Sequence, residues 1–245
     1  MTTKTKSIPF TQLVKILKPF TSKTDTRPAL KHIYHDGKHL IATNSHILAR
    51  IPTEHITKLP TNHQFYFDPR KNEIVQCSQQ YPKTSRLFPT QFKTEIKIID
   101  INEFLTIAKE ARRFVGNKRA VKLVISENYI TVRLEKDGEI FEKQTKIVLN
   151  GIENELYVNS SYLVHCLELL KKMDKLSDDS ITMNIAGRLR PIYFNKDEIV
   201  QCSQQYPKTS RLFPTQFKSE IKILDINEFL TIAKEARKFV GNKLS

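Results

Sequence analysis

Glycine, cysteine and long hydrophobic runs are scarce in this sequence. Only 6 of its 245 residues are glycine, and it contains neither GxxxxGK[ST] nor GxGxxG, so we expect no glycine-rich phosphate loop and no nucleotide hydrolysis. Its longer apolar stretches, such as Tyr162 to Leu170, are interrupted by charged or polar residues and are shorter than the roughly 18 residues that a membrane span needs. The first ten residues contain no apolar segment typical of a secretory signal. We therefore expect no membrane association.

The few cysteines and the absence of catalytic motifs narrow the function further. Cys77, Cys166 and Cys202 form no CxxC pair, which favours a reducing, cytoplasmic location. Six of the seven histidines lie within residues 32–63, but strand alternation would point His32 and His35 in opposite directions, and no zinc-ligand spacing occurs. No nucleophile motif or carboxylate cluster is present. We expect no metal, no cofactor and no active site.

Basic residues are abundant, and they are concentrated near the N-terminus. The chain holds 40 Lys or Arg against 26 Asp or Glu. Residues 1–70 hold eleven of the basic residues and only four of the acidic ones, which is half of the net charge of +14. Clustered Lys and Arg displace counterions from phosphates, so the charge favours nucleic acid as a partner. A surface that only keeps the protein soluble is the alternative interpretation.

A near-identical internal repeat is the strongest organisational feature. Residues 71–118 recur at 196–243, and only four of the 48 positions differ: Asn72/Asp197, Thr94/Ser219, Ile99/Leu224 and Arg113/Lys238. A fold tolerates far more change than this at exposed positions, so the repeat indicates a recent duplication. The first copy continues into strand-like sequence, whereas the second reaches Ser245 without it. Its helix must pack elsewhere, fray, or dock where residues 71–118 normally sit, including in a neighbouring molecule.

Apolar residues at helical spacing predict three amphipathic helices. The first contains Leu13, Ile16, Leu17 and Phe20 and ends near Pro19. The second opens with Asp100 and Glu103, which have the spacing of a capping box. Its inward residues are Ile101, Phe104, Leu105, Ala108 and Val115, and its outward residues are Lys109, Arg112 and Arg113. The third follows Asn159 and carries Leu163, Leu167 and Leu170 on one face.

Alternating residues and turn signals predict antiparallel strands around these helices. Asp36-Gly37 and Asp137-Gly138 are two-residue turns typical of hairpins. The predicted strands are 29–34, 38–43, 121–125, 129–134, 140–149, 155–158, 180–185 and 190–194. One unit, a strand, a helix and antiparallel strands, thus recurs at 6–50, 95–149 and 155–194, and in part at 220–245. We predict an α+β fold with helices on one face of a curved antiparallel sheet.

Four motifs, in the same order along the chain, resemble the bacterial DNA polymerase III β subunit family, the sliding clamps. A phage or mobile-element variant of this family is one form that the resemblance allows. DTRPALKHIYHDGKHLIATNSHILARIP (25–52) is similar to the signature of the clamp's middle domain. QYPKTSRLFP (80–89) resembles the segment that links the middle and last domains. SENYITV (126–132) and ELYVNSSYLVHCLELL (155–170) resemble the last domain. The resemblance implies a DNA-clamp fold made of repeated units.

The resemblance also implies domain boundaries. Residues 1–92 resemble a shortened middle domain, 93–195 the last domain, and 196–245 a partial unit that duplicates 71–118. No counterpart of the clamp's first domain is present. The family closes its last domain with a short hydrophobic strand, whereas here the duplicated segment follows Phe194 directly.

The site residues that the resemblance implies form two sets. A hydrophobic cleft that receives peptides of polymerases and clamp loaders would contain Leu30, Thr43, Ser45, His46, Leu48, Pro82, Arg86 and Leu87. Double-stranded DNA would be held, without reading its sequence, by Lys15, Lys18, Lys23, Arg27, Arg70, Lys71, Lys109, Arg112, Arg113, Lys171 and Lys172. The leading hypothesis is a homo-oligomeric processivity factor. A truncated clamp that only binds clamp partners and a simple basic DNA-binding protein are the alternatives.

Overall fold

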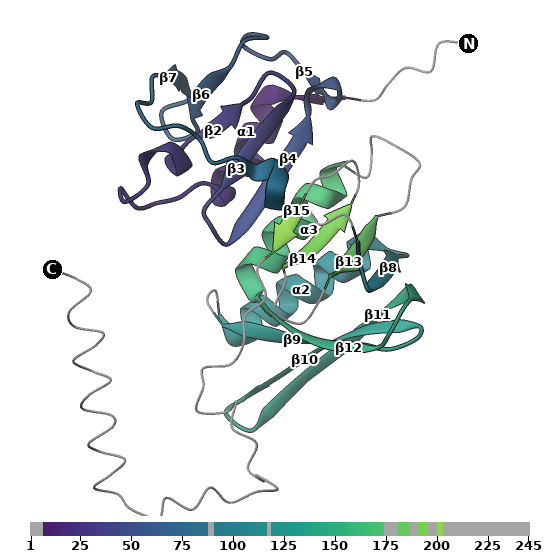
Figure 1. Ribbon diagram of the computed structural model, residues 1–245. Coiled ribbons are helices and arrows are strands. Elements are labelled where there is room, and N and C mark those ends of the chain that lie inside the picture. Colours follow the sequence, from purple (N-terminus) through teal and green to yellow (C-terminus); the bar gives the residue numbers. More distant parts are fainter. Residues whose placement is uncertain are drawn as a thin grey trace, which may run out of the picture. The chain divides into compact units, whose positions relative to one another are not determined.

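A computed structural model describes residues 7–87, 91–116, 119–173, 181–186, 191–195 and 200–202 (Figure 1). The side chains of Arg86, Asn195 and residues 200–202 are not described. The chain divides into a unit of residues 1–207 and a second unit of residues 208–245, so every described residue belongs to the first. The helix expected near 225–240 and the partial unit at 220–245 lie outside the described residues.

One antiparallel sheet of thirteen strands organises the described residues. Its strand order is β12-β9-β10-β11-β8-β13-β14-β15-β4-β3-β2-β6-β7. The strands of the N-terminal part are β2 (Ile33–His35), β3 (His39–Thr43), β4 (Ile47–Pro52), β6 (Phe65–Asp68) and β7 (Glu73–Val75). The others are β8 (Thr94–Ile98), β9 (Ala120–Ile125), β10 (Tyr129–Lys136), β11 (Glu139–Asn150), β12 (Asn154–Asn159), β13 (Thr182–Ile185), β14 (Ile192–Asn195) and β15 (Val200–Cys202). A separate parallel pair joins β1 (Ile8–Pro9) to β5 (Ile56–Thr57).

Three α-helices pack with this sheet, as the apolar spacing predicted. They are α1 (Phe10–Leu17), α2 (Ile101–Val115) and α3 (Ser160–Met173). Helix α3 contacts both α1 and α2, and α2 packs on β10 and β11. Four short 3-10 turns complete the elements: η1 (Lys18–Phe20), η2 (Pro28–Lys31), η3 (Thr53–His55) and η4 (Thr84–Leu87). Within the described part, no helix combines the length and apolarity needed to span a membrane. The predicted α+β architecture is confirmed.

Two hydrophobic clusters hold the described residues together. The larger one joins the inward faces of the helices to the sheet, and Leu13, Phe104 and Leu167 are fully buried in it. The smaller one lies on the other face of the β3–β4 hairpin and contains Ala29, Leu30, Ile41, Leu48 and Tyr81. Because side chains alternate along a strand, Leu40 and Ala42 belong to the large cluster and Ile41 to the small one. The hairpin therefore has two buried faces.

Both predicted hairpin turns form, but the first is shifted by one residue. Asp137 (φ 53°) and Gly138 (φ 83°) form the expected tight turn. In the first hairpin the Asp36 N–H donates to the His39 carbonyl, so the two central residues are Gly37 and Lys38 rather than Asp36 and Gly37. Gly37 has φ 97°, a left-handed conformation that glycine adopts without strain.

The helix caps agree with the sequence at Asp100 and Asn159 but not at Glu103. Oδ1 of Asp100 accepts hydrogen bonds from the N–H groups of Asn102 and Glu103. The Asn159 side chain caps α3 in the same way. The Glu103 carboxylate, by contrast, accepts from the Thr145 hydroxyl of β11 instead of closing a capping box. It therefore ties α2 to the sheet.

Two strand predictions were wrong in detail. Residues 29–31 form the 3-10 turn η2 and not the start of a strand. Pro28 fixes the first φ of this turn, and proline is well tolerated at that position. The second difference is β15, which comes from the duplicated segment. Val200–Cys202 pairs with β14 on one side and with β4 on the other, so the closing strand that the sequence comparison found missing is supplied by the second copy.

Candidate partner-binding cleft and basic helix surface

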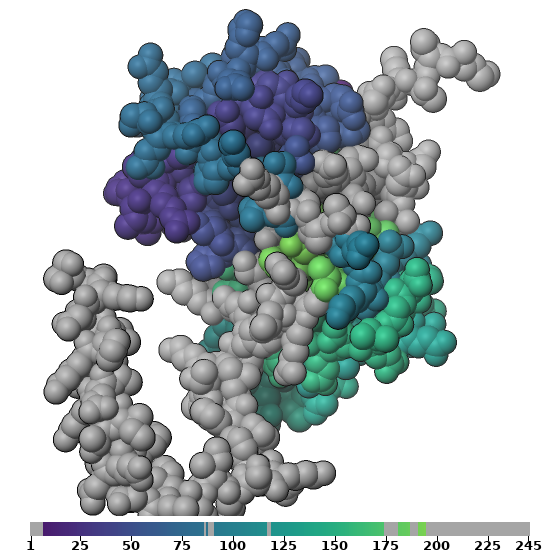
Figure 2. Space-filling model, in the orientation of Figure 1, coloured from purple at the N-terminus to yellow at the C-terminus, as the bar shows by residue number. Residues whose placement is uncertain are grey.

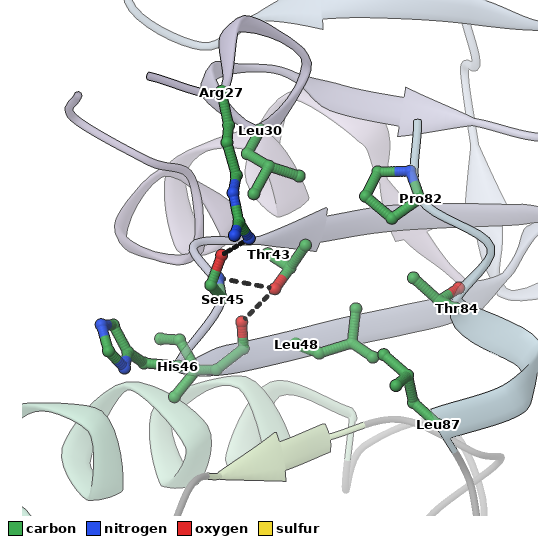
Figure 3. A pocket seen from close by; sticks show the side chains of 10 residues that line it. Arg27, Leu30, Thr43, Ser45, His46, Leu48, Pro82, Thr84 and Leu87 are labelled. Carbon is green, nitrogen blue, oxygen red and sulfur yellow. Dashed lines mark hydrogen bonds between the residues drawn. The ribbon is translucent and has the colours of Figure 1, made fainter. Parts of the chain in front are cut away.

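A cavity of about 230 Å³ lies at the end of the β3–β4 hairpin, where the segment before β8 crosses it. Seven of the eight predicted cleft residues line it: Leu30, Thr43, Ser45, His46, Leu48, Pro82 and Leu87. The eighth, Arg86, belongs to η4, and its side chain is not among those described. Arg27, Ile47 and Thr84 complete the lining (Figure 3). The structure thus brings together residues that are up to 60 positions apart, from Arg27 to Leu87.

Polar contacts fix the loop between β3 and β4 at the mouth of this cleft. The Thr43 hydroxyl donates to the Ile47 carbonyl (2.8 Å) and accepts from the Ser45 N–H (3.1 Å). The Asn44 side chain accepts from the N–H groups of His46 and Ile47. Ser45 has φ 75°, a conformation that costs free energy for any residue other than glycine. The hydrogen bonds hold this strained residue in place.

Arg27, which the sequence analysis placed in the DNA set, lines the cleft. Its Nη1 donates to the Ser45 hydroxyl at 3.0 Å, and the two side chains meet at the rim of the cavity (Figure 3). The sequence placed Arg27 and Ser45 in different sets because 18 positions separate them. The hairpin and η2 bring them together.

Stacked aromatic rings fix the opposite wall of the cleft. Tyr81, which is 4% exposed, stacks on Tyr34 with ring centroids 4.9 Å apart. The Tyr66 hydroxyl donates to the Gln79 carbonyl and accepts from the Tyr81 N–H, each at 2.9 Å. Burial raises the pKa of Tyr81, so its ring remains neutral at ordinary pH. The wall that carries Pro82 and Leu87 is therefore preformed.

Two residues that the sequence analysis missed support the cleft from the C-terminal part. The Tyr162 ring of α3 stacks on His46 at 5.6 Å. The Tyr193 hydroxyl of β14 donates to the Leu87 carbonyl at 3.0 Å. Tyr162 falls within a motif used for the resemblance, but nothing in a single sequence marks either tyrosine as a neighbour of residues more than 100 positions away.

The predicted DNA-binding residues lie on the three helices and nearby turns. Lys15 of α1, Lys18 of η1 and Lys23 are exposed and form no ion pair with any residue the structure describes. Arg113 of α2 and Lys171 of α3 are also exposed, whereas Arg112 and Lys172 are half-buried. Because α3 contacts α1 and α2, the helices that carry Lys15, Arg112, Arg113, Lys171 and Lys172 pack against one another. Figure 2 shows the surface of residues 7–87 in purple and blue.

Three other members of the predicted DNA set have protein partners. Lys109 Nζ lies 2.8 Å from Glu168 Oε1 of α3. His165 and Lys109 lower the pKa of Glu168 to about 2. Arg70 donates to the Ser22 carbonyl at 2.7 Å, and Lys71 lies 3.7 Å from Glu73. These partners fix the side chains of Lys109 and Arg70 within the protein.

The clustered histidines do not converge. Nδ1 of the buried His35 lies 2.9 Å from the His63 carbonyl, His39 contacts Asp36, and His46 stacks on Tyr162. Across the part of the chain that the structure describes, no three His, Cys, Asp or Glu side chains are grouped so that they could hold a metal ion. The histidines there have separate structural neighbours.

Solved structures with a similar fold are sliding clamps. The DNA polymerase sliding clamp of Bacillus subtilis matches with 20% identity and a TM-score of 0.61, over 80% of this chain and 63% of the clamp. DNA polymerase III subunit beta of Borrelia burgdorferi, solved with a natural product, matches with 14% identity and a TM-score of 0.64, over 81% and 61%. The clamp of Bartonella birtlesii bound to griselimycin matches with 17% identity and a TM-score of 0.59, over 80% and 64%.

The similarity to sliding clamps is thus found by comparing structures and not by comparing sequences. No protein-family model matches the chain, and no curated protein matches it. The chain spans somewhat less than two thirds of the clamps that it matches first. The predicted resemblance and fold class are confirmed: these residues adopt the fold of the DNA polymerase III beta sliding clamps.

Proposed function

We propose that this chain, which has the sliding-clamp fold, is a clamp-like processivity factor without an active site of its own. It would hold double-stranded DNA without sequence specificity, as a homo-oligomer, and tether a DNA polymerase through the cleft. Tethering raises the effective concentration of the polymerase at the primer, and no cofactor is required. Residues 1–92 and 93–195 would act as two clamp domains, and 196–245 as an appended partial unit.

The observation that carries the proposal is the cleft. Sequence positions chosen by resemblance converge on one cavity with an apolar floor of Leu30 and Leu48 and a polar rim of Arg27 and Ser45. An apolar pocket with a few fixed polar groups suits a short peptide. Leu87, which is 48% exposed, offers the incoming peptide an apolar contact at the entrance.

Peptide binding tests the proposal directly. A fluorescently labelled clamp-binding peptide from a DNA polymerase is titrated with the protein, and its polarisation is measured. Saturable binding is expected. Leu48 is only 2% exposed, so a charge there would unfold the protein. Leu87→Asp is the better variant because Leu87 is half exposed, and we expect it to weaken binding at least tenfold.

Ile152→Asp is the matched control, since Ile152 is 63% exposed and does not line the cleft. It should bind the peptide like the unsubstituted protein. Equal binding by the unsubstituted protein and Leu87→Asp, or no binding at all, would refute peptide capture by this cleft.

The second candidate function is a clamp-like protein that binds clamp partners but does not encircle DNA. The chain spans only 63% of the first clamps that it matches, which favours this alternative. Retention on closed circular DNA, compared with linear DNA of the same length, separates the two. A ring is retained only on the circle, whereas a protein that binds phosphates from one side dissociates from both at the same rate.

A further inference from the structure

A second cavity, of about 200 Å³, lies directly beside the cleft. Pro82 and Thr84 line both cavities, so the two are separated only by the segment around these residues. The lining of the second cavity includes Tyr34 and Ile41 as well as the basic residues Lys83 and Arg50. Nothing in the sequence comparison singled out this position.

The two cavities follow the same face of the β3–β4 hairpin. Thr43 pairs with Leu48 at the cleft, and Ile41 pairs with Arg50 at the second cavity. These pairs are two residues apart, which is roughly 7 Å along a strand. Alternate side chains of an extended peptide have the same spacing. One bound peptide can therefore place side chains in both cavities.

The segment Pro82–Thr84 forms a ridge between the two cavities, and its neighbours hold it in place, so both cavities are preformed. Tyr81 lies beneath it, stacked on Tyr34 and hydrogen-bonded through its N–H to the Tyr66 hydroxyl. Thr84 is buried, whereas Pro82 is exposed at the top of the ridge. A peptide that crosses Pro82 would not need to reorder the wall, which lowers the entropic cost of binding.

The second cavity differs from the cleft in its charge. The Asp36 carboxylate in its lining already accepts from the N–H groups of Lys38 and His39 and lies 3.2 Å from the His39 ring. Burial opposes its ionisation, but these hydrogen bonds outweigh burial and lower the pKa of Asp36. Arg50 is held beside His39, and Lys83 is exposed without an ion pair to any described residue. The lining thus carries two positive charges, on Lys83 and Arg50, against the one negative charge of Asp36.

We propose that this second cavity is a subsite for an acidic side chain of the bound peptide, next to the apolar residue that fills the cleft. Lys83 would pair with the incoming carboxylate, and Tyr34 and Pro82 would contact its methylene groups. The inference rests on the proposed function of the cleft and adds the class of peptide it selects: an extended segment with an apolar anchor and a glutamate or aspartate close to it.

A scanned peptide series tests the subsite. The labelled polymerase peptide is made in pairs, with glutamate or glutamine at each position flanking its apolar anchor, and polarisation gives each affinity. At one position the glutamate peptide should bind about three- to fivefold more tightly than its glutamine partner, the size expected for a half-exposed ion pair. In Lys83→Glu this preference should disappear or reverse, while the glutamine peptide keeps its affinity.

Lys146→Glu is the matched charge reversal, because Lys146 is exposed on β11 and outside both cavities. It should leave the preference unchanged. If the glutamine peptides bind and Leu87→Asp weakens them, but no position prefers glutamate or Lys83→Glu changes nothing, the subsite is refuted and the cleft stands. If no peptide binds, both are refuted.

Discussion

The two parts of the described chain differ in how several of their basic residues are partnered. In the N-terminal part, Lys15, Lys18 and Lys23 project from α1 and the residues after it without an ion-pair partner among the described residues. In the C-terminal part, four basic side chains on the helices and the sheet form ion pairs. The pairs are Lys109 with Glu168, Lys122 with Glu155, Arg133 with Glu142 and Lys143 with Glu110, at 2.7 to 3.3 Å.

This difference shows that net charge is a poor guide to a binding surface. Residues 1–70 and the remaining 175 residues each carry an excess of seven positive charges. A paired lysine has already replaced part of its hydration with a carboxylate, so it gains less from a phosphate than an unpaired lysine does. Lys15, Lys18 and Lys23 are therefore stronger DNA candidates than the paired lysines of the C-terminal part.

The largest expected effect is on DNA affinity. The triple variant Lys15→Glu, Lys18→Glu, Lys23→Glu should bind double-stranded DNA at least tenfold more weakly. Its salt dependence should also fall, because each phosphate contact contributes about 0.9 to the slope of log affinity against log salt. Fluorescence anisotropy of a labelled duplex at several salt concentrations measures both.

The matched control reverses charges that are already paired: Lys122→Glu, Arg133→Glu and Lys143→Glu. It changes the net charge by the same amount. An equal loss of DNA affinity in both triple variants would mean that only the total charge matters, and the contrast between the two parts would fail.

The second effect is on stability and concerns the pair between α2 and α3. Lys109→Met removes the partner of Glu168 and should lower the melting temperature by about 2–4 °C at neutral pH, because a partly exposed ion pair contributes up to about 1 kcal/mol. Thermal unfolding followed by circular dichroism measures this. DNA affinity should change less than in a Lys15→Met variant, and the opposite order would place Lys109 in the DNA surface.

The pH dependence of the same pair has a definite direction. Neighbouring His165 and Lys109 lower the pKa of Glu168 from 4.5 to about 2. A carboxyl whose pKa is lower in the folded state stabilises the protein fully above pH 4.5 and loses this contribution as the pH falls toward 2. The difference in melting temperature between the unsubstituted protein and Glu168→Gln should therefore be largest above pH 5 and vanish near pH 2. A difference that stays constant over this range would contradict the pairing.

The smallest effect is expected at the rim of the cleft. Ser45→Gly relieves the positive φ but removes the bond from Arg27, so the melting temperature should rise by only about 1 °C. Ser45→Ala loses the bond and keeps the strain, so it should melt below the unsubstituted protein. Glycine and alanine variants with the same melting temperature would show that Ser45 is not strained.

Local features were predictable from the sequence because they depend on neighbours in the chain. The amphipathic spacing of α1 and α2, the Asp137-Gly138 turn and the Asp100 cap all involve residues within a few positions. The resemblance located seven residues of the cleft. Their roles in binding, like the two-domain division, remain predictions.

Features that depend on distant packing could not be predicted. Lys109 was expected to face outward, but α3 brings Glu168 to it from 59 positions away. Glu103 had the spacing of a capping residue, yet its carboxylate accepts from the Thr145 hydroxyl of the sheet. The duplication gave no indication that its second copy would form β15 beside β4 in the interior of the sheet, because the equivalent residues of the first copy, 75–77, start at the end of the edge strand β7.

The position of β15 has a consequence for how the chain is made. Residues 47–49 of β4 pair with β3 or its turn on one side, but their other side stays open until Val200–Cys202 has been synthesised, nearly 150 residues later. At typical translation rates of about 5–20 residues per second, this takes roughly 10 to 30 seconds. An open strand edge invites pairing with other chains during that time. Arg50 and Pro52, which follow the segment covered by β15 directly within β4, are residues of the kind that discourage such pairing.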